Sequence, residues 1–318
     1  MTSIRDHAAT VEGVRIHWAE AGEASSKSPV VLIHGLNNSC LTWSKAVHGL
    51  ASDRRVLMPD LPGHGRSARP DAPYALDWHA HIVARWLATL GLEKLDVIGH
   101  SFGGGVAQML LLECPEQVRR LVLVAAGGLG RGVCLWLRLA SLPGVIEYLG
   151  QPFMALGTRL ALRSPRDGVT PQDILELSRF NAQAGSARAF GRSVRDVIGW
   201  RGQRRSFHAR AGEIAQLPPL LVLWGDRDPL IPISHARAFA ASVEGAAFKV
   251  FSGAGHYPYN ERPEEFAQVS RAFLDDPAAP AVRLKPPLES RPSRGSPKGS
   301  LSSASNTAAL TFSHRAES

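Results

Sequence analysis

The chain of 318 residues is long enough for one large domain with an insertion, and with 44% hydrophobic and 20% charged residues it has the composition of a globular protein. Its three cysteines lack disulfide-framework spacing and no basic-then-apolar segment opens the chain, so we expect a reducing, cytoplasmic location. No apolar run approaches the about 18 residues of a spanning helix, so no integral membrane association is expected.

The net charge of +8 is concentrated in two segments. Residues 130–213 hold thirteen Arg against six Asp and Glu, and residues 277–318 hold six basic residues against two Glu. The first segment is either a set of solvated helix faces or an insertion that meets an anionic substrate or an anionic membrane surface. No nucleic-acid-binding motif accompanies the charge, so nucleic acid is not an expected partner. The sequence does not indicate an oligomeric state.

Strand and helix patterns alternate along the first part of the chain. A half-buried strand is predicted at 14–20, and continuous apolar runs predict buried strands at 29–33, 55–60, 95–98 and 121–126. Helical periodicity fills the gaps at 41–50, 76–90 and 106–114. This alternation predicts an α/β fold with a doubly wound, mostly parallel sheet.

The alternation stops after residue 129 and resumes near residue 214. Between them only helical periodicity is found, over 135–142, 145–161, 171–183 and 187–200. Strands are again predicted at 220–224 and 248–251, with helices at 235–243 and 263–274. We therefore predict a core formed by residues 1–129 and 214–276, an inserted helical lid at 130–213, and a disordered tail at 277–318 that is rich in Pro, Ser, Arg, Gly and Ala.

The strongest chemical signal is the Gly-x-Ser-x-Gly motif at residues 99–103. It follows a predicted strand and opens a predicted helix, which is the context in which Ser101 would be a nucleophile on a sharp turn. Gly99 and Gly103 have no Cβ that would clash in such a turn. The N-terminus of the following helix favours negative charge developing beside Ser101.

A serine hydroxyl needs a base that takes its proton and an acid that orients the base. His256 directly follows a predicted strand, and Asp226 and Asp228 both follow the preceding strand in the chain. Carboxyl ends of parallel strands meet at one edge of a sheet, so these groups are expected near Ser101. The residues alone leave Asp226 and Asp228 as alternatives for the acid.

An oxyanion hole needs backbone N–H donors. Phe102 follows the nucleophile and supplies the first donor. The loop after the strand 29–33 supplies the second, for which we choose Leu36 with Asn37 as the alternative. We interpret His34, Asp60 and His64 as residues that stabilise these loops.

At these residues the chain resembles the α/β-hydrolase superfamily. The motifs that carry the resemblance are His34-Gly35, Asp60-Leu61-Pro62-Gly63-His64-Gly65, Gly99-His100-Ser101-Phe102-Gly103-Gly104, Gly225-Asp226-Arg227-Asp228 and Gly255-His256 with Glu261-Arg262-Pro263-Glu264. The resemblance covers residues 10–275 and implies Ser101 as the nucleophile and His256 as the base. It implies Asp228 as the acid, because the family places that residue just before an apolar-Pro step.

Departures from the motifs of particular branches of the superfamily narrow the range of expected activities. Epoxide hydrolases and haloalkane dehalogenases of this fold carry Asp in place of Ser101, and the epoxide type needs two lid tyrosines where this lid has only Tyr148. Carbon–carbon hydrolases of meta-cleavage products share the Ser triad and the lid. Their Gly-rich oxyanion loop is replaced here by 36–38, and Tyr257 stands where they often carry Trp.

We therefore expect a serine hydrolase, a carboxylesterase that cleaves a small hydrophobic ester through an acyl-enzyme without a metal or cofactor. The expected substrate contacts are Asn37, Tyr257 and the lid arginines Arg188 and Arg192, either of which could hold a carboxylate. A carbon–carbon hydrolase and a ligand-binding sensor with weak turnover remain as alternatives.

Overall fold

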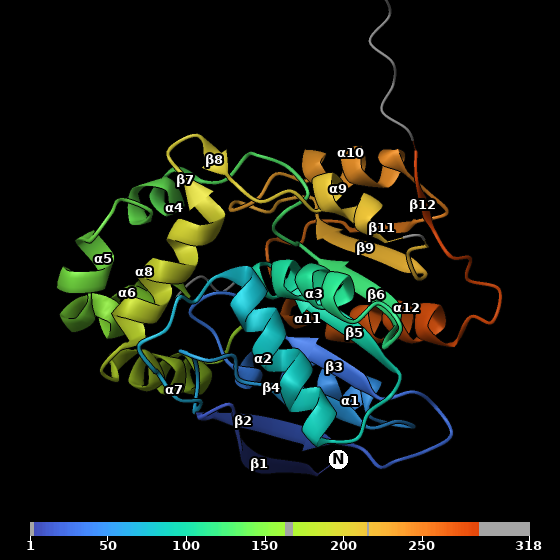
Figure 1. Cartoon of the computed structure of the whole chain (residues 1–318), viewed down its shortest axis with the longest axis horizontal. Coiled ribbons are helices and arrows are strands. Elements are labelled where there is room, and N and C mark those ends of the chain that lie inside the picture. The colour runs from blue at the N-terminus through green and yellow to red at the C-terminus, as the bar shows by residue number, and fades with distance from the viewer. Residues whose placement is uncertain (1–2, 163–167, 215, 286–318) are drawn as a thin grey trace, which may run out of the picture. The chain divides into compact units, whose positions relative to one another are not determined.

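A twisted sheet forms the centre of the protein in the computed structural model, which describes residues 3–162, 168–214 and 216–285 (Figure 1). Within these residues the sheet has eight strands in the order β1-β2-β4-β3-β5-β6-β9-β11. The strands are β1 (Ile4–Val11), β2 (Val14–Ala21), β3 (Val30–Ile33), β4 (Val56–Pro59), β5 (Leu95–His100), β6 (Val118–Val124), β9 (Leu220–Gly225) and β11 (Ala247–Phe251). Strand β2 runs antiparallel to β1 and β4, and the remaining neighbours are parallel. The predicted doubly wound, mostly parallel sheet is confirmed.

Helices cover both faces of this sheet because its central strands are apolar on both sides. The covering helices are α1 (Val47–Leu50), α2 (Leu76–Thr89), α3 (Phe102–Glu113), α10 (Ser234–Ser242) and α12 (Pro263–Asp275). Val31 and Ile33 of β3 pack into a hydrophobic cluster with α2, α3 and α10, whereas Val30 and Leu32 pack with α1 and α12. The alternation explains why the sequence of β3 reads as a continuous apolar run.

The segment between β6 and β9 is mainly helical and lies beside the sheet (Figure 1). It contains α4 (Leu135–Ala140), α5 (Val145–Leu149), a 3-10 turn (Gln151–Phe153), α6 (Met154–Ala161), α7 (Pro171–Ala182) and α8 (Ser186–Val197). A small hydrophobic cluster of its own, which includes Leu137, Met154 and Phe190, holds α4, α6 and α8 together. Residues 163–167 of the predicted lid lie outside the described residues.

Two details of this segment differ from the prediction. Helix α8 ends at Val197 and is followed by an antiparallel hairpin of β7 (Ile198–Gly199) and β8 (Gly202–Gln203), where only helix was expected. Gly202 adopts a φ of +105°, which allows the tight turn. Phe207 of α9 (Phe207–Arg210) and Ala211 pack into the cluster beneath the sheet, so the end of the predicted lid belongs to the core.

The predicted start of the tail, at residue 277, lies too early in the chain. Val282 is fully buried and bridges to Leu217, and β12 (Arg283–Leu284) pairs with β10 (Val243–Glu244). The apolar side chain of Val282 and these backbone hydrogen bonds fix residues that composition alone assigned to disorder. Residues 286–318 of the predicted tail lie outside the described residues.

Candidate active site

Ser101 lies on the turn between β5 and α3 in a strained backbone conformation. Its φ of +53° and ψ of −116° are of a kind that costs of the order of 1–3 kcal/mol for a residue with a side chain. The turn is held because the Ser101 N–H donates to Val124 O at 3.0 Å and the Ser101 carbonyl accepts from Gly127 N at 3.0 Å. A Cβ on Gly103 would lie 2.3 Å from Ile33 O. Glycine is therefore required for helix α3 to start so close to β3.

A buried histidine–aspartate pair lies on the loops after the last two strands of the sheet. His256 Nδ1 is 2.7 Å from Asp228 Oδ2, and both side chains are almost completely buried. Asp228 Oδ1 accepts the backbone N–H groups of Leu230 at 2.8 Å and Ile231 at 3.0 Å, which fixes the carboxylate. An aspartate at Nδ1 places the histidine proton there and leaves Nε2 as a base.

Asp226, the other candidate acid, has a different role. Its carboxylate accepts the Gly253 N–H at 2.7 Å, and the residue is exposed. It therefore closes the turn after β11 rather than contacting His256. The structure brings Asp228 to the histidine, as the resemblance implied.

Ser101 and His256 line the same cavity, which has a volume of about 180 Å³. Asn37 and Tyr257, two of the four predicted substrate contacts, also line it, as does Leu36, the predicted oxyanion-hole donor. No hydrogen bond between the Ser101 hydroxyl and His256 is recorded within the described residues; such catalytic bonds are often long in enzymes without substrate.

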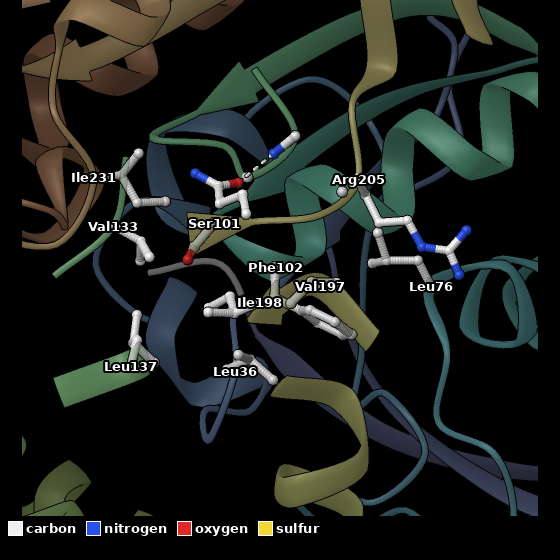
Figure 2. Close-up of a pocket in the computed structure, with 14 residues that line it drawn as sticks. Leu36, Leu76, Ser101, Phe102, Val133, Leu137, Val197, Ile198, Arg205 and Ile231 are labelled. Carbon is white, nitrogen blue, oxygen red and sulfur yellow. Dashed lines mark hydrogen bonds between the residues drawn. The ribbon is translucent and has the colours of Figure 1, made fainter. Parts of the chain in front are cut away.

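A second, smaller cavity adjoins Ser101 from the side of Phe102. It has a volume of about 50 Å³ and is mainly apolar. Figure 2 shows the Ser101 side chain directed towards the apolar wall, which includes Val133, Leu137 and Ile198. The serine therefore lies between two cavities that could hold the two sides of a scissile bond.

The loop after β3 approaches Ser101 closely. A Cβ on Gly35 would lie 3.2 Å from Ser101 Cβ and 3.0 Å from His100 Nδ1, so no larger residue fits without movement. Within the described residues neither Leu36 N–H nor Phe102 N–H donates a hydrogen bond. Two free N–H donors beside a nucleophile are the requirement of an oxyanion hole.

His34 holds this loop in place. Its Nδ1–H donates to Gly35 O at 2.8 Å, and its Nε2 accepts the Leu61 N–H at 3.0 Å. Burial lowers the pKa of His34, which keeps the ring neutral and able to accept. This is the loop-stabilising role predicted for His34.

His100 is a residue of the site that sequence reasoning missed. Its Nε2 is 2.9 Å from the carbonyl oxygen of His256, and its Nδ1 is 3.2 Å from the hydroxyl of Tyr259, which is 2.8 Å from Thr42 Oγ1. Burial lowers the pKa of His100 well below its ordinary value. His100, at the variable position of Gly-x-Ser, thus ties the turn of Ser101 to the loop that carries His256.

Glu261 fixes the same loop from α11 (Pro258–Glu261). Its carboxylate accepts the N–H groups of Gly255 at 2.9 Å and Tyr257 at 3.3 Å, on either side of His256. The only local signal in the sequence was the acidic residue five positions after the histidine. His256 is thus held by its side chain, its carbonyl and both neighbouring amides.

Arg188 and Arg192 do not reach the site, contrary to the prediction. Arg192 pairs with Glu147 at 2.8 Å and with Asp71 at 2.6 Å, and Arg188 donates to Arg69 O at 3.1 Å. The two arginines lie on the face of α8 that is opposite Phe190 and Val194, and they join this helix to α5 and to the loop before α2. Their role in the described structure is in ion pairs that hold the helical segment.

The arginine that does line a cavity beside Ser101 is Arg205 (Figure 2). It is paired with Asp196 at 2.6 Å and Asp77 at 3.3 Å, and its guanidinium points away from Ser101. Its charge is therefore compensated before any ligand arrives. It supplies no strong carboxylate site in the described cavity.

One cluster of metal-ligand residue types, His17, Cys40 and Asp60, is found within the described residues. Asp60 already accepts hydrogen bonds from His17 Nδ1 at 2.8 Å, Cys40 N at 2.6 Å and Arg66 N at 2.9 Å. Burial raises the pKa of Asp60, but these donors outweigh it and lower the pKa overall. The cluster is a loop-holding network, as predicted for Asp60.

Comparisons with known proteins agree with this geometry. The sequence model of the alpha/beta hydrolase fold matches residues 28–263. An uncharacterized protein of Mycobacterium tuberculosis H37Rv is 32% identical over 84% of this chain and 80% of its own length. A 2-hydroxymuconate semialdehyde hydrolase of Pseudomonas sp. CF600 is also 32% identical, over 85% of this chain and 94% of its own.

A solved structure with the same fold is a membrane phospholipase A, described as a bacterial virulence factor. It is 27% identical, has a TM-score of 0.69, and the match covers 86% of each chain. No helix within the described residues combines the length and apolar character needed to cross a membrane. By its sequence match and its sheet, the chain belongs to the α/β hydrolase fold family and is a hydrolase of that family.

Proposed function

We propose that this hydrolase cleaves carboxylic esters through an acyl-enzyme formed on Ser101. The observation that carries the proposal is the buried His256–Asp228 hydrogen bond of 2.7 Å, in the cavity that the strained Ser101 also lines. In this reaction His256 Nε2 takes the proton of the Ser101 hydroxyl as its oxygen attacks the ester carbonyl.

The next steps use the same residues in turn. The N–H groups of Leu36 and Phe102 donate to the oxyanion of the tetrahedral intermediate. Protonated His256 then gives its proton to the leaving alcohol, and the acyl group stays on Ser101. Water attacks the acyl-enzyme with His256 as the base, releasing the acid and restoring the hydroxyl.

The helices α4 to α8, which make up most of the predicted lid, act as a lid in this proposal. Trp136, Leu137 and Phe190 of these helices form part of the cavity wall around Ser101 and His256, which supports the role. Exclusion of water by such a wall strengthens the oxyanion interactions. The three free cysteines support a cytoplasmic location.

Carbon–carbon cleavage is the second candidate, since the relative from Pseudomonas sp. CF600 is named a 2-hydroxymuconate semialdehyde hydrolase. Such substrates carry a carboxylate, and Arg205, the arginine in the described cavity wall, is already paired with two acids. The ester reaction needs no cationic group and fits the apolar cavity better.

Turnover of p-nitrophenyl acetate by the wild type and by Ser101→Ala tests the proposal. Exposed Ser234 offers a matched control, and Ser234→Ala should keep full activity. We expect Ser101→Ala to lose at least about three orders of magnitude in kcat. Selective cleavage of a vinylogous diketone acid over the ester would favour the second candidate.

A further inference from the structure

The helices α4, α5 and α6 expose an apolar face that is unusual for a protein in water. Of the thirteen exposed large apolar side chains in the described residues, ten lie between residues 135 and 160. Tyr148 is 77% exposed, Leu149 69%, Phe153 65%, Leu135 62% and Leu156 55%. Seven of these ten side chains line one groove, and an exposed apolar patch of this kind marks a surface that binds another apolar body.

An open groove crosses this apolar face and leads towards the catalytic cavity. It has a volume of about 800 Å³ and an almost entirely apolar wall, with Leu149 and Phe153 among its residues. It shares Asn37, Trp136 and Phe190 with the cavity that Ser101 and His256 line. A chain of methylene groups could therefore lie in the groove while its ester carbonyl reaches Ser101.

The exposed charges that helices α4 to α6 carry are positive. Glu147 is the one acidic residue in the described part of 131–162, and its side chain is 6% exposed and held by Arg192 and Arg195. Arg138 and Arg159 lie on α4 and α6 with no carboxylate of a described residue at ion-pair distance. A second copy of the chain would meet this face with the same positive charges, which disfavours a symmetric dimer.

The hairpin β7–β8 extends the positive surface next to α4 (Figure 1). Its basic cavity, of about 560 Å³, is lined by Arg131, Arg201, Arg204 and Arg205 and by no carboxylate. The first three pair with no described acid, and Trp200 at the turn is 63% exposed. Tryptophan and arginine side chains are enriched where proteins contact a lipid–water interface.

We propose that the apolar face of α4–α6 docks on an anionic lipid surface, so that a long acyl chain enters the groove and its ester reaches Ser101. This inference rests on the proposed function and names its substrate as a long-chain acyl ester held in lipid. Apolar side chains enter the acyl region, while the arginines of the hairpin meet lipid phosphates, for which their planar donors are suited.

Sedimentation with lipid vesicles tests the docking. We expect binding to phosphatidylcholine vesicles that contain phosphatidylglycerol, and much weaker binding to phosphatidylcholine alone or at high salt. Arg201→Gln and Arg204→Gln should each weaken binding about fivefold. Leu156→Gln, which lies outside the groove, should weaken it about tenfold. Ile4→Gln, an exposed apolar residue on edge strand β1, is the matched control and should have no effect.

Two substrates separate this inference from the proposed function. Leu156→Gln should slow hydrolysis of p-nitrophenyl palmitate in the anionic vesicles but not of soluble p-nitrophenyl acetate. Ser101→Ala should bind vesicles like the wild type although it turns over neither ester. Vesicle binding without any ester turnover would therefore contradict the proposed function and leave the docking intact.

Three results would overturn the docking. The first is an active enzyme that ignores both kinds of vesicle. The second is equal binding to both, unaffected by the arginine substitutions. The third is a stable dimer that Leu156→Gln dissociates, because a second copy would then cover the face.

Discussion

The hydrogen bond between Asp228 and His256 can be altered almost without changing the shape of the site. In Asp228→Asn the Oδ1 atom can still accept the N–H groups of Leu230 and Ile231, so the loop keeps its anchor. The Nδ2 group of the asparagine then takes the place of Asp228 Oδ2, which lies 2.7 Å from His256 Nδ1 in the wild type, and this group can only donate a hydrogen bond. The histidine must therefore carry its proton on Nε2, where it cannot act as a base for Ser101.

The expected cost is set by comparison with serine hydrolases in which the same tautomer is lost. There, kcat falls about 10⁴-fold. This corresponds to about 5.4 kcal/mol of lost transition-state stabilisation. KM should change little, because Asp228 is covered by His256 and does not line the cavity.

Steady-state hydrolysis of p-nitrophenyl acetate over a range of pH measures this effect, with thermal unfolding as a check on the fold. Asp226→Asn is the matched control, since its exposed carboxylate accepts only the Gly253 N–H in the loop after β11. It should change kcat by about twofold at most. Loss of activity in Asp226→Asn with retention in Asp228→Asn would refute the assignment.

Three further substitutions test separate parts of the structure. Gly35→Ala places a Cβ 3.2 Å from Ser101 Cβ, so kcat should fall about a hundredfold with little change in the melting temperature; unchanged kcat would contradict the oxyanion loop. His100→Leu leaves His256 O without its donor, and we expect a loss of about 2 kcal/mol in urea unfolding together with a fall in kcat for the folded fraction; a merely structural residue would leave that kcat unchanged. Burial raises the pKa of Asp96 to about 6, and an ion pair with Arg119 opposes the shift only in part. Because the unfolded chain then releases this proton at a lower pH than the folded protein does, the free energy of unfolding of the wild type falls as the pH rises towards about 6. The stability of Asp96→Asn relative to the wild type should therefore rise by up to about 3 kcal/mol between about pH 4 and pH 6 in urea unfolding, whereas a constant difference would contradict the raised pKa.

The predictable parts of the fold are those in which a short stretch of sequence determines its own structure. The apolar run of β3 is buried on both faces, and a Cβ on Gly99 or Gly103 would clash with neighbouring atoms of the turn. The positions of Ser101, His256 and Asp228 followed because carboxyl ends of parallel strands share one edge. Spacing in the chain was sufficient for Ser101 and His256, whereas the choice of Asp228 over Asp226 came from the family resemblance.

The remaining features depend on partners that are distant in the sequence. Arg192 is held by Glu147 and Asp71, and no pattern within α8 shows which face of the helix meets them. His100 acquires its role from the carbonyl of His256, 156 residues later in the chain. Val282 is ordered by pairing with Leu217, which overrides the tail-like composition around it.

The central claim is that Ser101 is an activated nucleophile, and covalent labelling tests it most directly. The protein is treated with a fluorophosphonate, digested, and the modified peptide identified by mass spectrometry. The structure predicts one adduct, on Ser101, which forms rapidly in the wild type, much more slowly in Asp228→Asn, and not at all in Ser101→Ala. An adduct on another residue, or no adduct on the folded wild type, would contradict the proposed mechanism.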